Sequence, residues 1–242
     1  MRRLLPDFAD DVDLVAAYAY PGGPYVRANM VASADGASAV KGVTQGLSSA
    51  ADRRLLALLR GLSDVILVGA STVRAEGYRP VRPREVWEHL RAGRTRTPPL
   101  AVLTRRLDLD LTGPLFTEAP DDARTIVITT ASAPADRLAT AADNADLVVA
   151  GTDRVDMKDA VAELVRRGHE RILCEGGPRV LAQVAAAGLL DELCLTVSPL
   201  LVAGGASRVL SGPSIPDTLP MRIGHLIEDD DALFLRYTRR TP

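Results

Sequence analysis

Two short stretches of this chain have residue types that can hold a phosphate group. The first, Glu175-Gly176-Gly177-Pro178, follows an apolar run and precedes the Ala-rich stretch 179–187. Small residues followed by proline at a helix start direct unpaired N–H groups and the positive end of the helix dipole at an anion. The second, Val68–Val73, follows another apolar run and has hydroxyls at Ser71 and Thr72. Two such turns fit a pyrophosphate gripped from both sides, although strand-to-helix turns also use glycine for steric reasons alone.

Two carboxylates are candidates for the chemistry. Glu175 comes at the predicted end of a strand, where its carboxylate can accept hydrogen bonds from N–H groups of a bound ligand. It could instead serve only as a negative charge at a helix start. Asp35 lies in Ser33-Ala34-Asp35-Gly36, although Asp-Gly is also a common turn pair.

Signatures of several other chemistries are absent from the sequence. It has no Walker P-loop, no H-E-x-x-H, no G-x-S-x-G and no G-x-G-x-x-G fingerprint. The three histidines, His89, His169 and His225, have no metal-ligand spacing, so we expect no metal site. Cys174 and Cys194 cannot form a disulfide framework, and we expect both to be buried thiols in a reducing compartment.

The composition indicates a globular α/β protein. The 242 residues are 47% hydrophobic but only 4% aromatic, so the core must be aliphatic, which suits helices packed on a sheet. A net charge of −2 does not favour a nucleic-acid partner or a polybasic membrane binder. No signal-peptide core follows Met1, and no apolar run approaches the roughly 20 residues of a membrane span. We therefore expect a cytoplasmic protein with no nucleic-acid or membrane partner.

Apolar runs alternate with helical patterns along the chain. Strands are expected at 25–31, 65–68, 100–103, 125–129, 147–149, 171–174, 192–197 and 233–237. Helices are expected at 10–18, 51–62, 133–143, 156–168 and 179–187. Repeated β-α-β units imply a mostly parallel sheet with helices on both faces, and the last strands suggest an antiparallel edge. Residues 1–24 are expected to be an N-terminal extension and residues 25–242 a single domain.

The stretch from Arg79 to Pro99 is unusually basic. It contains six arginines and four prolines but only two acidic residues. This composition predicts a long surface loop around a short helix that contains Trp87 and Leu90. The loop could be a flap over an anionic ligand, or it could be solvated and poorly ordered.

Four segments together resemble the reductase domain of riboflavin biosynthesis. They are Ser33–Gly36, then Leu58–Arg60 leading into Val68–Glu76, then Glu175–Leu181, and finally Gly188–Leu193 running to Ser198-Pro199. From about Tyr25 to Tyr237 the chain is similar to RibD-type pyrimidine reductases. The resemblance implies a three-layer α/β/α fold of dihydrofolate reductase type, with a mostly parallel central sheet and an antiparallel edge. It also implies NADPH as the cofactor, a homodimer, and a stand-alone reductase without the zinc-binding deaminase domain of bifunctional members.

The resemblance also assigns residues to the two halves of the site. NADPH would contact Gly69, Ala70, Thr72, Glu76, Thr104, Arg105, Gly176, Gly177, Pro178, Arg179, Val180 and Leu181. Arg105 could pair with the 2′-phosphate, since a planar guanidinium suits phosphate oxygens, or it could be only a surface charge. The resemblance makes Glu175 and Asp35 the expected catalytic residues, with Glu175 accepting hydrogen bonds from the amino and ring N–H groups of a pyrimidine or pterin. The substrate would also contact Asn29, Ser33, Thr44, Gln45, Arg60 and Arg79.

The expected reaction is hydride transfer from NADPH to an electron-poor C=N carbon, with the protein supplying alignment. The first expected substrate is the phosphoribosylamino-uracil intermediate of riboflavin biosynthesis. Many riboflavin-pathway reductases have a lysine four residues before the motif serine, where this chain has Asn29. A dihydropterin or dihydrofolate is therefore the second expected substrate, and an NADP(H)-binding protein without turnover is a third interpretation.

Overall fold

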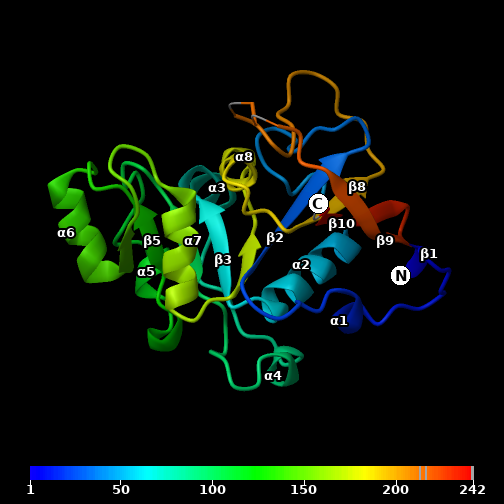
Figure 1. Ribbon diagram of the computed structural model, residues 1–242, viewed down its shortest axis with the longest axis horizontal. Helices are drawn as coiled ribbons and strands as arrows, with labels where there is room; N and C mark the ends of the chain where they lie inside the picture. Colours follow the sequence, from blue (N-terminus) through cyan, green and yellow to red (C-terminus); the bar gives the residue numbers. More distant parts are fainter. Residues whose placement is uncertain (213, 216, 241–242) are drawn as a thin grey trace. The chain divides into compact units, whose positions relative to one another are not determined.

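The computed structural model describes residues 1–212, 214–215 and 217–240 (Figure 1). The chain forms two compact units. Unit 1 comprises Met1–Leu59 and Cys174–Pro242, and unit 2 comprises Arg60–Leu173. The chain passes from one unit to the other inside helix α2 (Ala50–Leu62) and inside strand β7 (Arg171–Cys174).

Unit 2 is an α/β layer with the strand order β7-β3-β4-β5-β6, in which β3 to β6 pair in parallel. Its strands besides β7 are β3 (Val65–Gly69), β4 (Leu100–Leu103), β5 (Ile126–Thr129) and β6 (Asp146–Val149). Its helices are α3 (Ala70–Glu76), α4 (Trp87–Leu90), α5 (Pro114–Thr117), a 3-10 turn (Asp121–Ala123), α6 (Ala135–Asn144) and α7 (Met157–Arg166). Every residue of β3, β4 and β5 is buried, as expected for aliphatic runs in a parallel sheet that is covered on both faces.

Unit 1 carries the antiparallel edge, with the strand order β1-β9-β10-β8-β2. Its elements are β1 (Arg2–Leu5), α1 (Leu14–Ala17), β2 (Tyr25–Ser33), α8 (Pro178–Ala186), β8 (Glu192–Ser198), β9 (Met221–Asp229) and β10 (Ala232–Arg239). Strands β2 and β8 pair in parallel, whereas β8, β10, β9 and β1 pair antiparallel. The expected α/β class, with parallel strands and an antiparallel edge, is confirmed.

The eight expected strands are all present, each with bounds within two residues of the prediction. Strands β1 and β9 were not predicted, because β1 is an exposed edge strand with two arginines and β9 has no clear apolar alternation. They pair with each other beside the N-terminus, where Arg2 forms an ion pair with Glu228 at 2.6 Å (Figure 1). The helix expected at 10–18 is only the single turn α1, with Asp13 as its N-cap.

A buried ion cluster joins the strands of unit 1. Arg27 and Glu192 are fully buried, and the Arg27 Nε donates a hydrogen bond to Glu192 Oε1 at 2.6 Å. The second carboxylate oxygen accepts from Arg236 Nη2 at 2.8 Å and from the Tyr25 hydroxyl at 3.0 Å. The Arg27 Nη1 donates to the Tyr18 carbonyl oxygen at 2.7 Å. The cluster thus links β2, β8 and β10 to the segment that follows α1.

The basic segment 79–99 packs against the rest of unit 2 through Trp87 and two of its arginines. Trp87 is only 2% exposed and contacts Gly61 so closely that a side chain at position 61 would clash with its ring. Arg91 donates to the carbonyl oxygens of Gly61 and Ser63, and Arg94 donates to those of Leu62 and Ser63. These carbonyls lie at the C-terminus of α2, where a helix has no internal donors for them. The expected short helix containing Trp87 and Leu90 is confirmed as α4, and residues 82–86 are exposed, as expected for a surface loop. A flap over an anionic ligand stays a prediction.

Candidate functional site

In unit 2, the expected cofactor residues gather at the carboxyl ends of neighbouring strands. Gly69, the last residue of β3, is the register partner of Leu103, the last residue of β4. Ala70 begins α3, and the buried Thr104 continues β4 with its N–H bonded to the carbonyl oxygen of Ile128 at 2.9 Å. The carboxyl edge of a parallel sheet is where ligands of α/β proteins bind. The structure therefore brings Gly69, Ala70 and Thr104 together at an edge suited to a ligand.

The remaining unit 2 candidates differ in exposure and in partners. Arg105 follows Thr104 and is exposed, whereas Thr72 and Glu76 on α3 are half-buried. Arg60 lies over the ring of Tyr78, with its guanidinium carbon 5.7 Å from the ring centroid. Arg79 forms an exposed ion pair with Glu118 at 3.0 Å, so a substrate anion would have to compete with that carboxylate.

In unit 1, the Gly-Gly turn connects β7 to α8. Glu175 is buried to 9% exposure, and Gly176 has a φ of +81°, in the left-handed region that favours glycine. A Cβ atom at Gly176 would lie 3.1 Å from the Met30 sulfur, so the position is also sterically tight. The Gly176–Gly177 peptide bond is cis. Gly177 is the N-cap of α8, and Pro178 is at its first position, as the sequence predicted for an anion-binding helix start.

The first turn of α8 can contact a ligand mainly through its backbone. Val180 and Leu181 are buried on the protein side of the helix, so neither side chain is available at the surface. Arg179 is exposed. A cofactor at this turn would therefore be held by N–H groups and the helix dipole, with Arg179 as the available cation.

The substrate-side candidates of unit 1 lie on and after β2. Asn29 and Ser33 are on the same face of that strand, paired in register with Cys194 and Ser198 of β8. The Asn29 Oδ1 is buried and has no hydrogen-bond partner among the described residues. Thr44 is half-buried and Gln45 exposed in the connection from β2 to α2, where the Thr44 carbonyl oxygen accepts from Leu47 N at 2.8 Å.

A buried carboxylate that sequence analysis did not single out lies over the same strand face. The Thr196 hydroxyl donates to Asp52 Oδ1 at 2.7 Å, and both side chains are buried. Thr196 is between Cys194 and Ser198 on β8, so Asp52 lies over the row between Asn29 and Ser33. In the sequence, Asp52 resembles any acidic residue in the first turn of a helix, which is why no local signal identified it.

Asp35 is held by the chain around it. The Ser33 hydroxyl donates to its Oδ1, and the backbone N–H groups of Val202 and Ala203 donate to its carboxylate at 3.2 and 2.7 Å. The hydroxyl and the two N–H groups lower the pKa of Asp35, so the carboxylate stays ionised at neutral pH.

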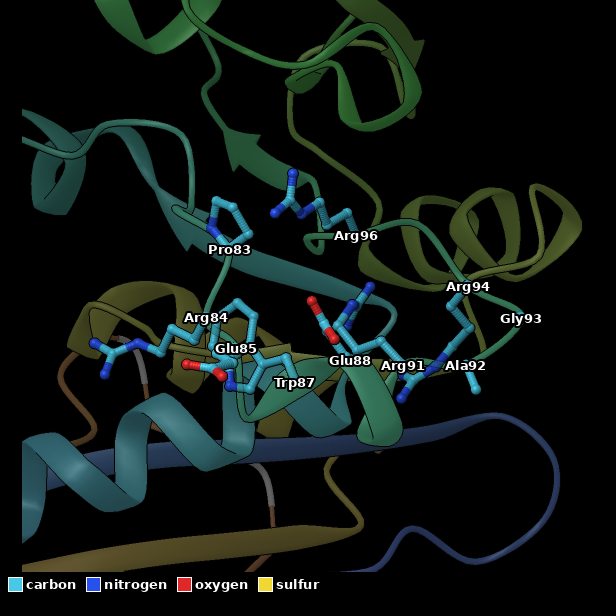
Figure 2. Close-up of a pocket in the computed structure, with 10 residues that line it drawn as sticks. All are labelled: Pro83, Arg84, Glu85, Trp87, Glu88, Arg91, Ala92, Gly93, Arg94 and Arg96. Atoms are coloured by element: carbon cyan, nitrogen blue, oxygen red, sulfur yellow. The ribbon is translucent and has the colours of Figure 1, made fainter.

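A pocket of about 430 Å³ lies in the basic segment (Figure 2). Two of its lining residues, Arg91 and Arg94, donate to carbonyl oxygens at the C-terminus of α2. Helix α4 lies near the N-terminal end of β3 (Figure 1). The Arg84 and Arg96 guanidinium groups lie apart from each other, and Glu85 and Glu88 also line the pocket (Figure 2). Arg91 and Arg94 are engaged by carbonyl oxygens at the end of α2, so an anion in the pocket would have to compete with these bonds.

Both cysteines are free and buried, as expected, and burial raises the pKa of the Cys174 thiol to about 12. Within the described ranges, no group of His, Cys, Asp and Glu side chains has an arrangement that could hold a metal ion. None of the described helices combines the length and the apolar character required to cross a bilayer.

Comparison with known proteins identifies the family. The sequence profile of the RibD C-terminal domain matches residues 24–233. The chain belongs to this family. It is 32% identical over 187 residues to the 2,5-diamino-6-ribosylamino-4(3H)-pyrimidinone 5′-phosphate reductase of Methanothermobacter thermautotrophicus, which covers 77% of this chain and 83% of the relative. The reductase of the same name from Archaeoglobus fulgidus is 30% identical over 184 residues, covering 75% and 83%.

A solved structure agrees with this membership of the RibD C-terminal domain family. A pyrimidine reductase-like protein of Corynebacterium diphtheriae superposes with a TM-score of 0.86 and 29% identity, over 95% of this chain and 99% of that one. The expected resemblance is thereby confirmed, and with it the RibD-type fold and the oxidoreductase class. The roles of individual site residues remain predictions.

Proposed function

We propose that this chain uses NADPH to reduce the ribosylamino-pyrimidine 5′-phosphate of riboflavin biosynthesis. The reductases of Methanothermobacter and Archaeoglobus are named for the diamino-pyrimidinone form of this compound. The related 5-amino-6-(5-phosphoribosylamino)uracil is the other form to be tested. A homodimer in the cytoplasm is part of the same proposal, supported by the family resemblance and by the two free thiols.

The observation that carries this proposal is the turn from β7 to α8. It places a buried carboxylate, Glu175, directly before a glycine pair and a nine-residue helix that begins with proline. The helix start supplies N–H groups for a pyrophosphate, and the carboxylate supplies acceptors for pyrimidine N–H groups. NADPH, when bound, supplies the hydride, and the chain aligns the substrate carbon with it.

The substrate is tested in parallel assays of NADPH oxidation with three compounds: the diamino-pyrimidinone phosphate, 5-amino-6-(5-phosphoribosylamino)uracil and dihydrofolate. We expect turnover of one or both ribosylamino-pyrimidine phosphates, with a kcat/KM at least roughly 100-fold above that for dihydrofolate. Discrimination of this size is expected when a site hydrogen-bonds polar groups that the competitor lacks. A higher kcat/KM for dihydrofolate would favour a dihydropterin or dihydrofolate reductase, and no oxidation with any substrate would favour a binding protein without turnover.

The chain is also expected to bind NADPH more tightly than NADH. The exposed Arg105 follows the carboxyl end of β4, where a charge-assisted hydrogen bond to a 2′-phosphate can form. Arg105→Gln should therefore weaken NADPH binding roughly tenfold and leave NADH binding unchanged. The neighbouring exposed Arg106 provides the matched control, Arg106→Gln, and fluorescence titration gives the dissociation constants. Equal affinities of the unmodified protein for the two cofactors would contradict the assignment.

A further inference from the structure

The Asp35 carboxylate, in the turn after β2, accepts hydrogen bonds from the segment that follows β8. Asp35 accepts from Ala203 N at 2.7 Å and from Val202 N at 3.2 Å, across 168 and 167 residues of sequence. The adjacent Ala34 N donates to the carbonyl oxygen of Leu200 at 2.9 Å. Two successive residues of the turn therefore hold three residues of the segment, Leu200, Val202 and Ala203.

The backbone that Asp35 holds has an unusual conformation. Ala203 has a φ of +58°, a left-handed conformation that alanine adopts only at a free-energy cost, and Gly204 follows with a φ of +69°. The N–H groups of Val202 and Ala203 both point to one carboxylate, in the manner of a backbone nest around an anion. The negative charge of Asp35 thus stabilises a conformation that local sequence does not favour.

The same segment continues to the proposed cofactor turn. Ser207 contacts Ser38, whose N–H and hydroxyl both donate to the Ser207 carbonyl oxygen, at 2.9 and 2.8 Å. Ser211 N then donates to the carbonyl oxygen of Pro178, the first residue of α8, at 3.2 Å. We call residues 199–211 the strap, because they run from the end of β8, over the turn at 33–38, to the start of α8.

The strap is held by polar contacts more than by the core. Leu201 is 82% exposed and Leu200 is 43% exposed, so neither leucine anchors the strap by burial. When a segment has few buried apolar contacts, its local opening free energy depends on its hydrogen bonds. Loss of the Asp35 contacts should therefore loosen the strap without unfolding unit 1.

We propose that Asp35 is a positioning residue. It holds the strap so that the turn at 33–38 and the first turn of α8 keep the conformation required to bind ligand. In this arrangement Asp35 acts through the strap and does not touch the reacting atoms. The expected effect of Asp35 on turnover rests on the proposed reductase function, whereas its expected effect on the conformation of the strap does not.

The first test measures the strap in the protein without ligand. Asp35→Asn keeps the shape of the side chain but removes its charge and replaces one acceptor oxygen by an NH₂ group. We expect hydrogen exchange at Val202 and Ala203 to accelerate at least roughly tenfold, and chymotrypsin to cleave faster after Leu201. Asp110→Asn is the matched control, because Asp110 is an exposed turn carboxylate of unit 2 that accepts from Thr112 N. Unchanged exchange and cleavage in Asp35→Asn would overturn the proposal, whether or not the chain turns over a substrate.

The second test separates positioning from catalysis. For a positioning residue, Asp35→Asn should raise the KM values for NADPH and substrate roughly tenfold and change kcat at saturation less than about threefold. A kcat that falls by roughly a hundredfold or more with unchanged KM values would overturn the proposal and make Asp35 a catalytic residue.

Discussion

Glu192→Gln is expected to lower the free energy of unfolding by roughly 3–5 kcal/mol, because it leaves a buried charge without its partner. Arg27 is fully buried, and the Glu192 carboxylate is the group that neutralises it. Burial alone would raise the pKa of Glu192, but the hydrogen bond and charge of Arg236, together with those of Arg27, lower it. Urea unfolding of the variant and the unmodified protein at neutral pH measures the difference.

The exposed ion pair between Arg2 and Glu228 provides the control, since Glu228→Gln removes a carboxylate from a solvated pair and should cause little change. The sign of the pH dependence follows from the lowered pKa of Glu192. Its contribution is present above the pKa of the unfolded state and is lost as the pH falls through the lower folded value. The difference between the two proteins should therefore shrink in acid. A loss at neutral pH no larger than that of the control would show that the cluster is energetically neutral.

Glu175→Gln is expected to lower kcat/KM by roughly ten- to several hundred-fold. The variant keeps the size of the side chain but replaces one acceptor oxygen by an NH₂ group, which would face the N–H groups of the pyrimidine. A buried polar group left without a partner costs on the order of 1–3 kcal/mol, which corresponds to a loss of this size. The affinity for NADPH should change little, because backbone N–H groups further along the turn hold the pyrophosphate.

Steady-state kinetics and NADPH titration of the same preparation test this expectation. Glu170→Gln is the matched control, because Glu170 is an exposed carboxylate just before β7. If Glu175→Gln instead weakened NADPH binding and kept its turnover at saturation, Glu175 would belong to the cofactor site.

Local sequence patterns were sufficient for the parallel strands and for the turn that carries the candidate site. The run Val65–Val68 predicted β3, and the helical pattern of residues 51–62 predicted α2. The Gly-Gly-Pro turn could also be predicted, because its ability to bind an anion depends on residues that are adjacent in sequence.

Contacts between residues far apart in sequence were decided by the tertiary structure. Arg27 meets Glu192 across 165 residues, because β2 and β8 pair in one particular register. The backbone N–H groups in the strap that donate to Asp35 are likewise 167 and 168 residues away, so a local pattern that indicated a catalytic carboxylate or a turn could not reveal the strap. Periodicity and turn chemistry are local properties and can be predicted from sequence. The partner of a buried charge depends on sheet register and loop packing, which emerge only when the whole chain has folded.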